Sequence, residues 1–183
     1  MFSYLLERYE WVDAQLSSIN WRAIGLVKNR LSKDQSIRTS KMMHNWLNVG
    51  HQKAKIARNK EVGVCPCCGD AHESQDHLYQ CVHANMRRAV QDGIAQMEKV
   101  FHDENMPPGV TVAFTRQVRR ATGITAELLD CQCREANRAS ELQAELGPAA
   151  ILRGHHHVAW VTAIAATYKK RAPPRRKGGP HAE

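Results

Sequence analysis

The chain has 183 residues and a net charge of +8, with 43% hydrophobic and 24% charged residues. This length suits one domain with its own hydrophobic core, and the composition is typical of a globular protein. The longest apolar-leaning segment near the C-terminal end, residues 158–168, is much shorter than the about 20 residues of a membrane-spanning helix.

Positive charge is concentrated at the two ends of the chain. Residues 1–60 contain 11 Lys/Arg and 4 Asp/Glu, and residues 148–183 contain 7 Lys/Arg and 1 acid, so these segments carry +7 and +6. Residues 61–83 contain 4 acids and no Lys or Arg, and residues 84–147 are close to neutral. Two basic ends around an acidic middle suit a polyanion bound by the ends.

The first 50 residues predict three helices. Apolar side chains recur every three or four residues from Phe2 to Ile19, through Val12, as on one face of an amphipathic helix that ends near Asn20. A second helix is predicted from Trp21 to Leu31, with Trp21, Ile24, Val27 and Leu31 facing inward. A third starts at a capping box of Ser32 and Gln35, places Met43, Trp46 and Leu47 on its apolar face and ends at Gly50.

The following segment, residues 51–60, is basic because it contains Lys53, Lys55, Arg58 and Lys60. Such a run is either a solvated connector or a surface that contacts phosphates, and the pattern alone favours neither. Its position directly before a cysteine cluster favours the functional interpretation.

Two pairs of potential metal ligands follow. Cys65 and Cys68 have the C-x2-C spacing, and His77 and Cys81 have the H-x3-C spacing, with eight residues between the pairs. Pro66 and Gly69 suit a tight bend, and Ser74 suits the N-cap of a helix that places His77 and Cys81 on one face. Four sulfur and nitrogen ligands without an open position predict a structural, tetrahedral Zn2+ site.

Other nearby cysteines and histidines are poorer candidates for the same ion. Cys67 is too close in sequence to Cys65 and Cys68 to chelate with either, His72 lies in the intervening loop and His83 is off the predicted ligand face. The alternative is a cluster of reduced thiols without a metal. The tight clustering also argues against a disulfide framework, and with no signal peptide at the N-terminus we expect an intracellular, reducing compartment.

The segment Cys-Pro-Cys-Cys-Gly-Asp-Ala-His-Glu-Ser-Gln-Asp-His-Leu-Tyr-Gln-Cys, residues 65–81, resembles the zinc-binding segment near the C-terminal end of reverse transcriptases from eukaryotic non-LTR retrotransposons. Residues 41–50 resemble the helix that leads into that segment, and Gly154 and Trp160 resemble a Gly…Trp pattern in related reading frames. The resemblance covers about half the chain. It implies a fragment or a domesticated C-terminal part of such an enzyme.

The rest of the chain predicts further helices. One covers residues 86–103, and Pro107 and Gly109 end it. Residues 110–121 suit another helix, although residues 110–114 alternate as a short strand would. A longer helix is predicted from residue 126 to 146 and makes Cys131 and Cys133 ordinary thiols on a helix.

The C-terminal region predicts a last helix and a basic tail. The three histidines 155–157 are interpreted as a solvated helix start, with Val158, Val161, Ala165 and Tyr168 on the inner face and Trp160 on the flank. Residues 169–183 cannot build a core and predict a disordered tail. Its basic residues resemble a nuclear-import or nucleic-acid-binding arm: Lys169, Lys170, Arg171, Arg175, Arg176 and Lys177.

The sequence contains no motif that predicts catalysis. It has no adjacent Asp-Asp pair, as the palm motif of a reverse transcriptase would need to hold two metal ions, no glycine-rich phosphate loop and no H-E-x-x-H. We therefore expect no enzyme activity, and the polymerase core of the resembled family to be absent from these residues.

Together these patterns predict a mainly α-helical protein with a small embedded C2HC zinc knuckle. The predicted divisions are a basic helical segment at 1–60, the knuckle at 61–85, a helical segment at 86–168 that packs with the first, and the tail. The predicted function is nucleic-acid binding, DNA or RNA, in the nucleus and without a membrane partner. The alternatives are a protein-interaction module stabilised by zinc and a retroelement remnant without a present function.

Overall fold

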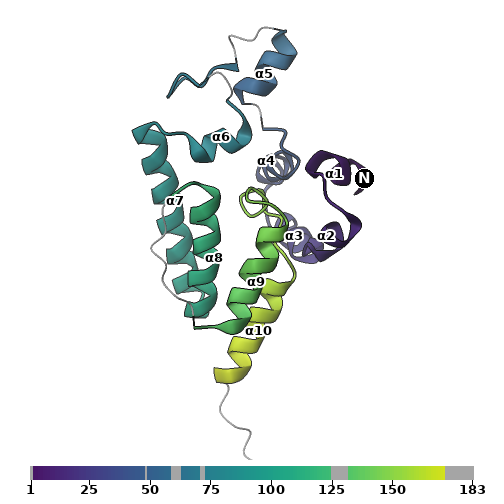
Figure 1. Cartoon of the computed structure of the whole chain (residues 1–183), viewed down its shortest axis with the longest axis vertical. Helices are drawn as coiled ribbons and strands as arrows, with labels where there is room; N and C mark the ends of the chain where they lie inside the picture. The colour runs from purple at the N-terminus through teal and green to yellow at the C-terminus, as the bar shows by residue number, and fades with distance from the viewer. Residues whose placement is uncertain (1, 48, 59–62, 71–72, 125–131, 172–183) are drawn as a thin grey trace, which may run out of the picture.

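The computed structural model describes residues 2–47, 49–58, 63–70, 73–124 and 132–171. Within these ranges it contains ten α-helices and no strand, which confirms the predicted mainly helical fold (Figure 1). The helices are α1 Phe2–Tyr9, α2 Asp13–Ser18, α3 Trp21–Lys28, α4 Lys33–Met43, α5 Gly50–Ala57, α6 Gln75–Gln80, α7 Ala84–Asp103, α8 Pro108–Ala121, α9 Arg134–Glu145 and α10 Ala159–Arg171. None of the described helices is long and apolar enough to cross a lipid bilayer.

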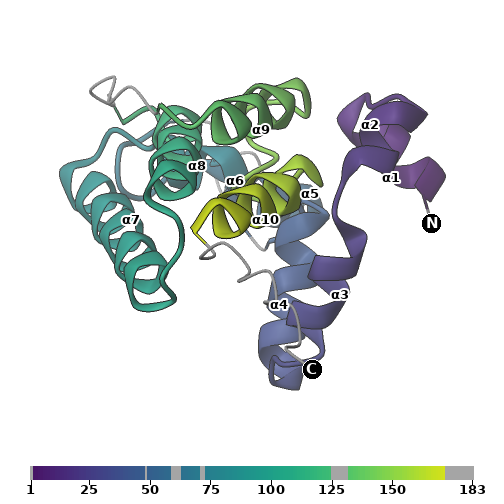
Figure 2. The same cartoon turned by 90° about the horizontal axis from the view of Figure 1, so that it is seen from below.

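The C-terminal helices form the main body of the molecule. Helix α9 packs between α8 and α10, and α7 packs on α8 (Figures 1 and 2). Their shared core combines small and large side chains, namely Val110, Ala113, Ala136, Ala139, Trp160 and Ala163. The alanines let the helix backbones approach closely, and Trp160 fills the space beside them.

The N-terminal helices cover one end of this body through a second cluster of buried side chains. It consists of Leu5, Trp11, Leu16 and Ile19 from the first 20 residues and Leu146 and Ala150 from the segment after α9. The indole N–H of Trp11 donates to the carbonyl of Leu146 at 3.0 Å. Ile19 also pairs with His157 in an isolated antiparallel bridge. The bridge fixes the segment just before α3 next to the segment just before α10.

The first predicted helix is wrong in one respect, because it breaks in the middle. Glu10 takes a left-handed conformation with φ of 55°, and α2 starts only at Asp13. Val12 is 62% exposed rather than buried. The break turns Trp11 into the second cluster, where its indole N–H finds the carbonyl of Leu146.

The third and fourth helices also differ from the prediction at their ends. The capping box of Ser32 and Gln35 is confirmed. Helix α4 ends at Met43, so Trp46 and Leu47 lie outside it, and Asn45 at φ 56° reverses the chain in place of the predicted Gly50. Gly50 instead begins α5. Val27 is 55% exposed, contrary to the inward position predicted for it in α3.

The C-terminal helices require three further corrections. Residues 110–121 are helical, which decides against the strand. Helix α9 begins at Arg134 and Cys133 is its N-cap, so the helix predicted from residue 126 starts too early; residues 125–131, Cys131 included, lie outside the described ranges. In α10 the inner face holds Trp160 and Ala163, whereas Val158, Val161 and Tyr168 are 42–52% exposed. The helix continues to Arg171, so the predicted boundary at residue 169 falls inside it.

The histidine run is not solvated as predicted, because His155 is buried and His156 and His157 are half-buried. His155 is 0% exposed, and its ring lies 5.1–6.1 Å from the rings of Tyr9, Trp11 and Trp21. Neither ring nitrogen has a hydrogen-bond partner. Burial, together with the nearby Arg153 guanidinium, lowers the pKa of His155 to about 3. Burial also lowers the pKa of His156 and of His157.

We expect this cluster to make the fold sensitive to acid. Unfolding returns His155 to a pKa of about 6.5, so below that pH the unfolded state binds a proton that the folded state excludes. Protonation of His155 should therefore have no effect on the free energy of unfolding above pH 6.5. Below pH 6.5 this one residue should lower that free energy by about 1.4 kcal/mol for each pH unit. Urea unfolding at pH 7.5 and at pH 5.5 measures this pH dependence of the free energy of unfolding. His155→Phe should remove the part of it that is due to His155. The control His102→Phe, at a side chain that is 91% exposed, should keep it; equal slopes for wild type and His155→Phe would contradict the assignment.

Candidate metal centre

The structure brings Cys65, Cys68, His77 and Cys81 into one cluster. One ligand atom from each lies within 4.8 Å of the ligand atoms of the others, which is close enough to hold a metal ion. The Sγ atoms of Cys65 and Cys81 are 4.0 Å apart, and His77 Nε2 is 3.3 Å from Cys68 Sγ. Three sulfurs and one imidazole nitrogen are a donor set that suits zinc.

The backbone explains how the first pair of cysteines converges. The N–H of Gly69 donates to the carbonyl of Cys65 at 2.9 Å, and the N–H of Cys65 donates to the carbonyl of Asp70 at 2.7 Å. Gly69 has a φ of +77°, a conformation that glycine adopts without steric cost. This tight turn points both sulfurs to the same side, as the C-x2-C spacing predicts.

The second pair is placed by α6. Ser74 caps the helix by accepting a hydrogen bond from the N–H of His77 at 3.1 Å, as predicted. Cys81 follows the last helical residue, and its N–H donates to the carbonyl of His77 at 2.7 Å. His77 and Cys81 therefore keep the i, i+4 spacing of one helix face, although Cys81 lies just beyond the end of α6. Both side chains face the turn that carries Cys65 and Cys68.

The electrostatics of the cluster favour the thiolate at Cys65 but not at Cys68. Despite a backbone hydrogen bond from Asp70, burial and the neighbouring Cys81 and Cys65 thiols raise the pKa of Cys68. Hydrogen bonding by backbone groups, that of Cys68 first, lowers the pKa of Cys65 to about 6, so that the thiolate, which is the metal-binding form, predominates at neutral pH. His77 presents Nε2 to the sulfurs, and its Nδ1 lies 3.7 Å from the Asp70 carboxylate. A carboxylate behind a ligand histidine helps to fix the orientation of its ring.

Cys67 and His83 are not part of this four-residue group. Cys67 is exposed. His83 is the N-cap of α7 and accepts a hydrogen bond from the N–H of Asn85. His72 is outside the described ranges. Among the described residues, no other group of histidines, cysteines and carboxylates is placed to hold a metal ion.

Two residues of α6 attach the cluster to the rest of the molecule. Gln75 is 2% exposed, and its amide donates to the carbonyl of Met42 at 2.8 Å. Both carboxylate oxygens of Asp76 accept from Arg153 Nη2, at 2.6 and 2.7 Å. The Arg153 guanidinium also lies 5.0 Å from the centre of the Tyr9 ring. The helix that carries two of the four candidate ligands is thus held by α4 and by the loop before α10.

The basic helix α5 is held against the cysteine turn at its first residue. The N–H of Gly50 donates to the Glu73 carboxylate at 2.5 Å, and the N–H of Glu73 donates to the carbonyl of Gly63 at 2.9 Å. A Cβ at position 50 would lie 3.1 Å from the Gly63 carbonyl oxygen and 2.7 Å from the Glu73 carboxylate. Gly50 is required for this close approach, and not as the predicted helix end.

The predicted nucleic-acid contacts are placed only in part. Lys53 and Lys55 are exposed on α5, and Arg58 is exposed at its C-cap in a left-handed conformation. The helix α10 includes Lys169, Lys170 and Arg171, whose side chains are outside the described part, as are residues 172–183 and Lys60. The prediction for these residues stays a prediction.

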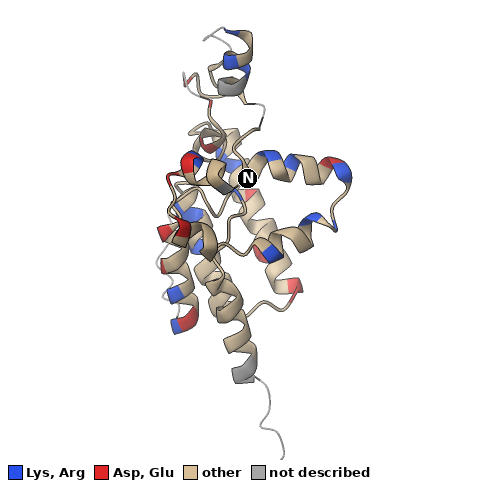
Figure 3. Ribbon diagram, turned by 90° about the vertical axis from the view of Figure 1, so that its right-hand side faces the viewer, with Lys and Arg blue, Asp and Glu red and all other residues tan. Residues whose placement is uncertain are grey.

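A second basic surface was not singled out residue by residue from the sequence. The α3–α4 pair with its connecting turn, residues 20–43, carries six Lys/Arg and a single acid, Asp34. These bases are Arg22, Lys28, Arg30, Lys33, Arg38 and Lys41, and blue predominates over red on this pair and on α5 in Figure 3. The +7 charge of residues 1–60 indicated a basic surface in this part of the chain. Only the structure shows that most of this charge lies on the α3–α4 pair.

No family model, curated protein or solved structure matches the chain. The donor set and the charge distribution are therefore the basis of the functional proposal.

Proposed function

We propose that this protein is a non-catalytic nucleic-acid-binding module stabilised by a structural zinc ion, and that it derives from the C-terminal part of a retroelement reverse transcriptase. The observation that carries the proposal is the contact of the basic helix α5 with the cysteine turn through Gly50 and Glu73. The proposed retroelement origin rests on the resemblance of residues 65–81. Localisation to the nucleus is also proposed, and it rests on the basic residues from Lys169 onward.

Cys65, Cys68, His77 and Cys81 would hold the zinc ion. Cys65 and Cys81 are 4% and 1% exposed, which suits a closed structural site better than a catalytic site with an open position. Bound zinc would cross-link the cysteine turn to α6. Because the first residue of α5 is hydrogen-bonded to Glu73, between that turn and α6, the ion would help to set the angle of the basic helix relative to the body of the molecule.

Asp70→Asn is expected to weaken zinc binding while leaving all four ligands in place. The substitution removes the carboxylate charge that lies beside Nδ1 of His77 and orients the ligand ring, and such changes typically cost about 10–100-fold in metal affinity. Competition with a chromophoric chelator measures the affinity directly. Asp92→Asn, at an exposed position of α7, is the matched control and should bind zinc as the wild type does.

The basic surface would bind nucleic acid through phosphates, because the described part of α3–α5 presents many cations and few acids. Phosphate contacts release condensed counterions, so the affinity should fall steeply with salt. Lys53→Gln, Lys55→Gln and Arg58→Gln together should make the slope of log K against log salt shallower by roughly one unit per lost contact on duplex DNA. Deleting residues 169–183 should weaken binding further.

Titrations with duplex DNA, single-stranded DNA and RNA at several salt concentrations test this function. The matched control removes the same charge from exposed positions elsewhere, with Arg88→Gln, Arg120→Gln and Arg134→Gln, and should change the slope less. Absence of binding to all three nucleic acids at micromolar protein would reject the proposal. It would favour a protein-interaction module, for which the exposed side chains of Trp46 and Ile56 offer apolar contacts.

A further inference from the structure

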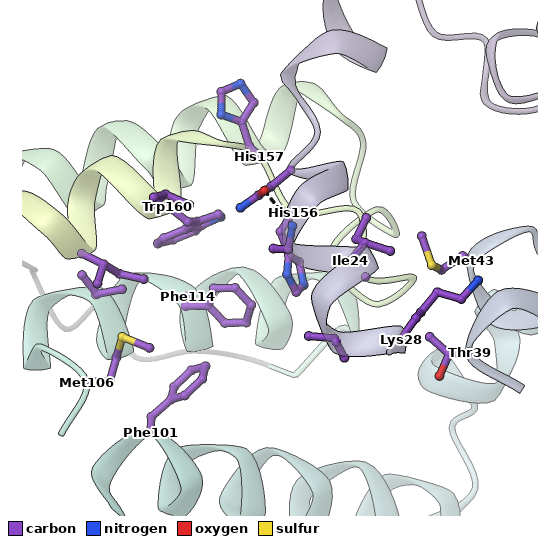
Figure 4. Close-up of a pocket in the computed structure, with 17 residues that line it drawn as sticks. Ile24, Lys28, Thr39, Met43, Phe101, Met106, Phe114, His156, His157 and Trp160 are labelled. Carbon is purple, nitrogen blue, oxygen red and sulfur yellow. Dashed lines mark hydrogen bonds between the residues drawn. The ribbon is translucent and has the colours of Figure 1, made fainter. Parts of the chain in front are cut away.

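A cavity of about 370 Å3 lies beneath α3 and is unrelated to the cysteine cluster (Figure 4). Helices α4, α7, α8 and α10 supply most of its other walls, and residues of the connecting segments, among them Met106, His156 and His157, complete the lining. Most of the lining is aliphatic or aromatic, and the volume is in the range of small-molecule sites. It is the kind of site that binds an apolar ligand rather than a nucleotide.

The cavity lies beside a helix, α3, whose start is fixed to the start of α10. Asn20 N–H donates to the carbonyl of His156 at 2.9 Å, and Ile19 pairs with His157, so the start of α3 is fixed to the start of α10. No residue of α3 is buried. Val27 on α3 and Val161 on α10 both line the cavity and are 55% and 52% exposed, which leaves an opening to solvent between these two helices.

The two ends of the cavity differ in chemistry. Phe101, Phe114 and Trp160 lie at one end, with the Phe114 ring 5.4 and 5.1 Å from the other two (Figure 4). Lys28 and Thr39 lie at the other end. Among the described residues no carboxylate forms an ion pair with Lys28.

We propose that this cavity binds a medium-chain aliphatic carboxylate. The chain lies against the aromatic end, and the carboxylate reaches the ammonium of Lys28 and the hydroxyl of Thr39. The basic tail of the protein does not suit the site, because residues 172–183 have no long apolar side chain and would bring arginines and a lysine to Lys28. The site shares Lys28 with the basic surface of α3–α5, but the proposal rests on the cavity and not on nucleic-acid binding.

Calorimetric titration of the full, zinc-loaded chain with octanoate, decanoate and decan-1-ol tests the site. Decanoate should bind once per chain and about tenfold tighter than octanoate, since two more methylenes are buried. Lys28→Gln should weaken decanoate about fivefold and leave decan-1-ol unchanged. Lys53→Gln removes the same charge from an exposed position outside the cavity and should leave decanoate binding unchanged.

Two variants that fill the cavity complete the test. Ala23→Phe and Val27→Trp place a ring in the cavity from α3, the second at a half-exposed position where folding is readily kept. Both should lose decanoate and decan-1-ol together while melting as the wild type does. The proposal is overturned if decanoate shows no saturable binding, if Lys53→Gln weakens it as much as Lys28→Gln, or if the folded filled variants bind it like the wild type.

Discussion

Cys81→Ser is expected to abolish stoichiometric zinc binding. Cys81 is 1% exposed and its sulfur lies 4.0 Å from that of Cys65, so serine would replace a thiolate by a much weaker ligand in the centre of the cluster. Zinc binding of this type contributes about 10–16 kcal/mol in small zinc domains, and its loss should unfold the knuckle locally. Metal analysis of the purified protein and hydrogen exchange over residues 63–83 measure the two effects.

Cys67→Ser is the matched control, because Cys67 is an exposed cysteine in the same turn. It should retain one zinc per chain, whereas Cys68→Ser and His77→Ala should lose it. Most of the helical circular-dichroism signal should survive chelation, since α8, α9 and α10 have a core of their own. Equal metal loss in Cys67→Ser and Cys81→Ser would refute the ligand assignment, and complete loss of helix signal would make zinc essential to the whole fold.

Gln143→Leu should lower the free energy of unfolding by about 3–5 kcal/mol. Gln143 is 2% exposed, and its amide donates to the carbonyl of His155 at 3.0 Å. Its carbonyl oxygen accepts from the N–H of His157 at 2.9 Å and the indole N–H of Trp160 at 3.1 Å. Leucine would leave these buried groups unpaired, and each such group costs about 1–3 kcal/mol.

Urea unfolding at pH 7.5 measures this loss. Gln91→Leu is the control, because it makes the same substitution at an exposed position of α7 and should stay within about 0.5 kcal/mol of the wild type. A loss of less than about 1 kcal/mol for Gln143→Leu would mean that water or a rearranged neighbour satisfies these groups.

Local signals in the sequence were sufficient to bring the four candidate ligands together and to place the capped starts of α4 and α6. The ligand pairs are each four or five residues long, and Ser32 and Ser74 cap their helices through the residue three positions later. Such features need only short-range geometry, so spacing predicts them. The same holds for Gly69, whose left-handed conformation follows from the turn it closes.

The errors concern which side of a helix is buried. Helix α10 has apolar residues on both sides, so periodicity could not decide between Val161 and the correct Trp160 and Ala163. His155 is buried by rings from Tyr9, Trp11 and Trp21, more than 130 residues earlier in the chain. A local sequence pattern cannot predict a contact with residues so far away in the chain. Without those contacts, the histidine would be exposed to solvent, as the sequence analysis predicted.

The ion pair between Asp76 and Arg153 has a consequence for how the protein would respond to the zinc supply. Asp76 precedes the ligand His77 in α6, and Arg153 lies between that helix and Tyr9. Zinc held at His77 and the packing of Arg153 on Tyr9 would be coupled through this ion pair, and any effect of one on the other would be reciprocal. The apparent stability of the knuckle and of its contact with Arg153 would rise with the logarithm of free zinc, so a cell depleted of zinc would contain less protein with this region folded, even with all four ligands present.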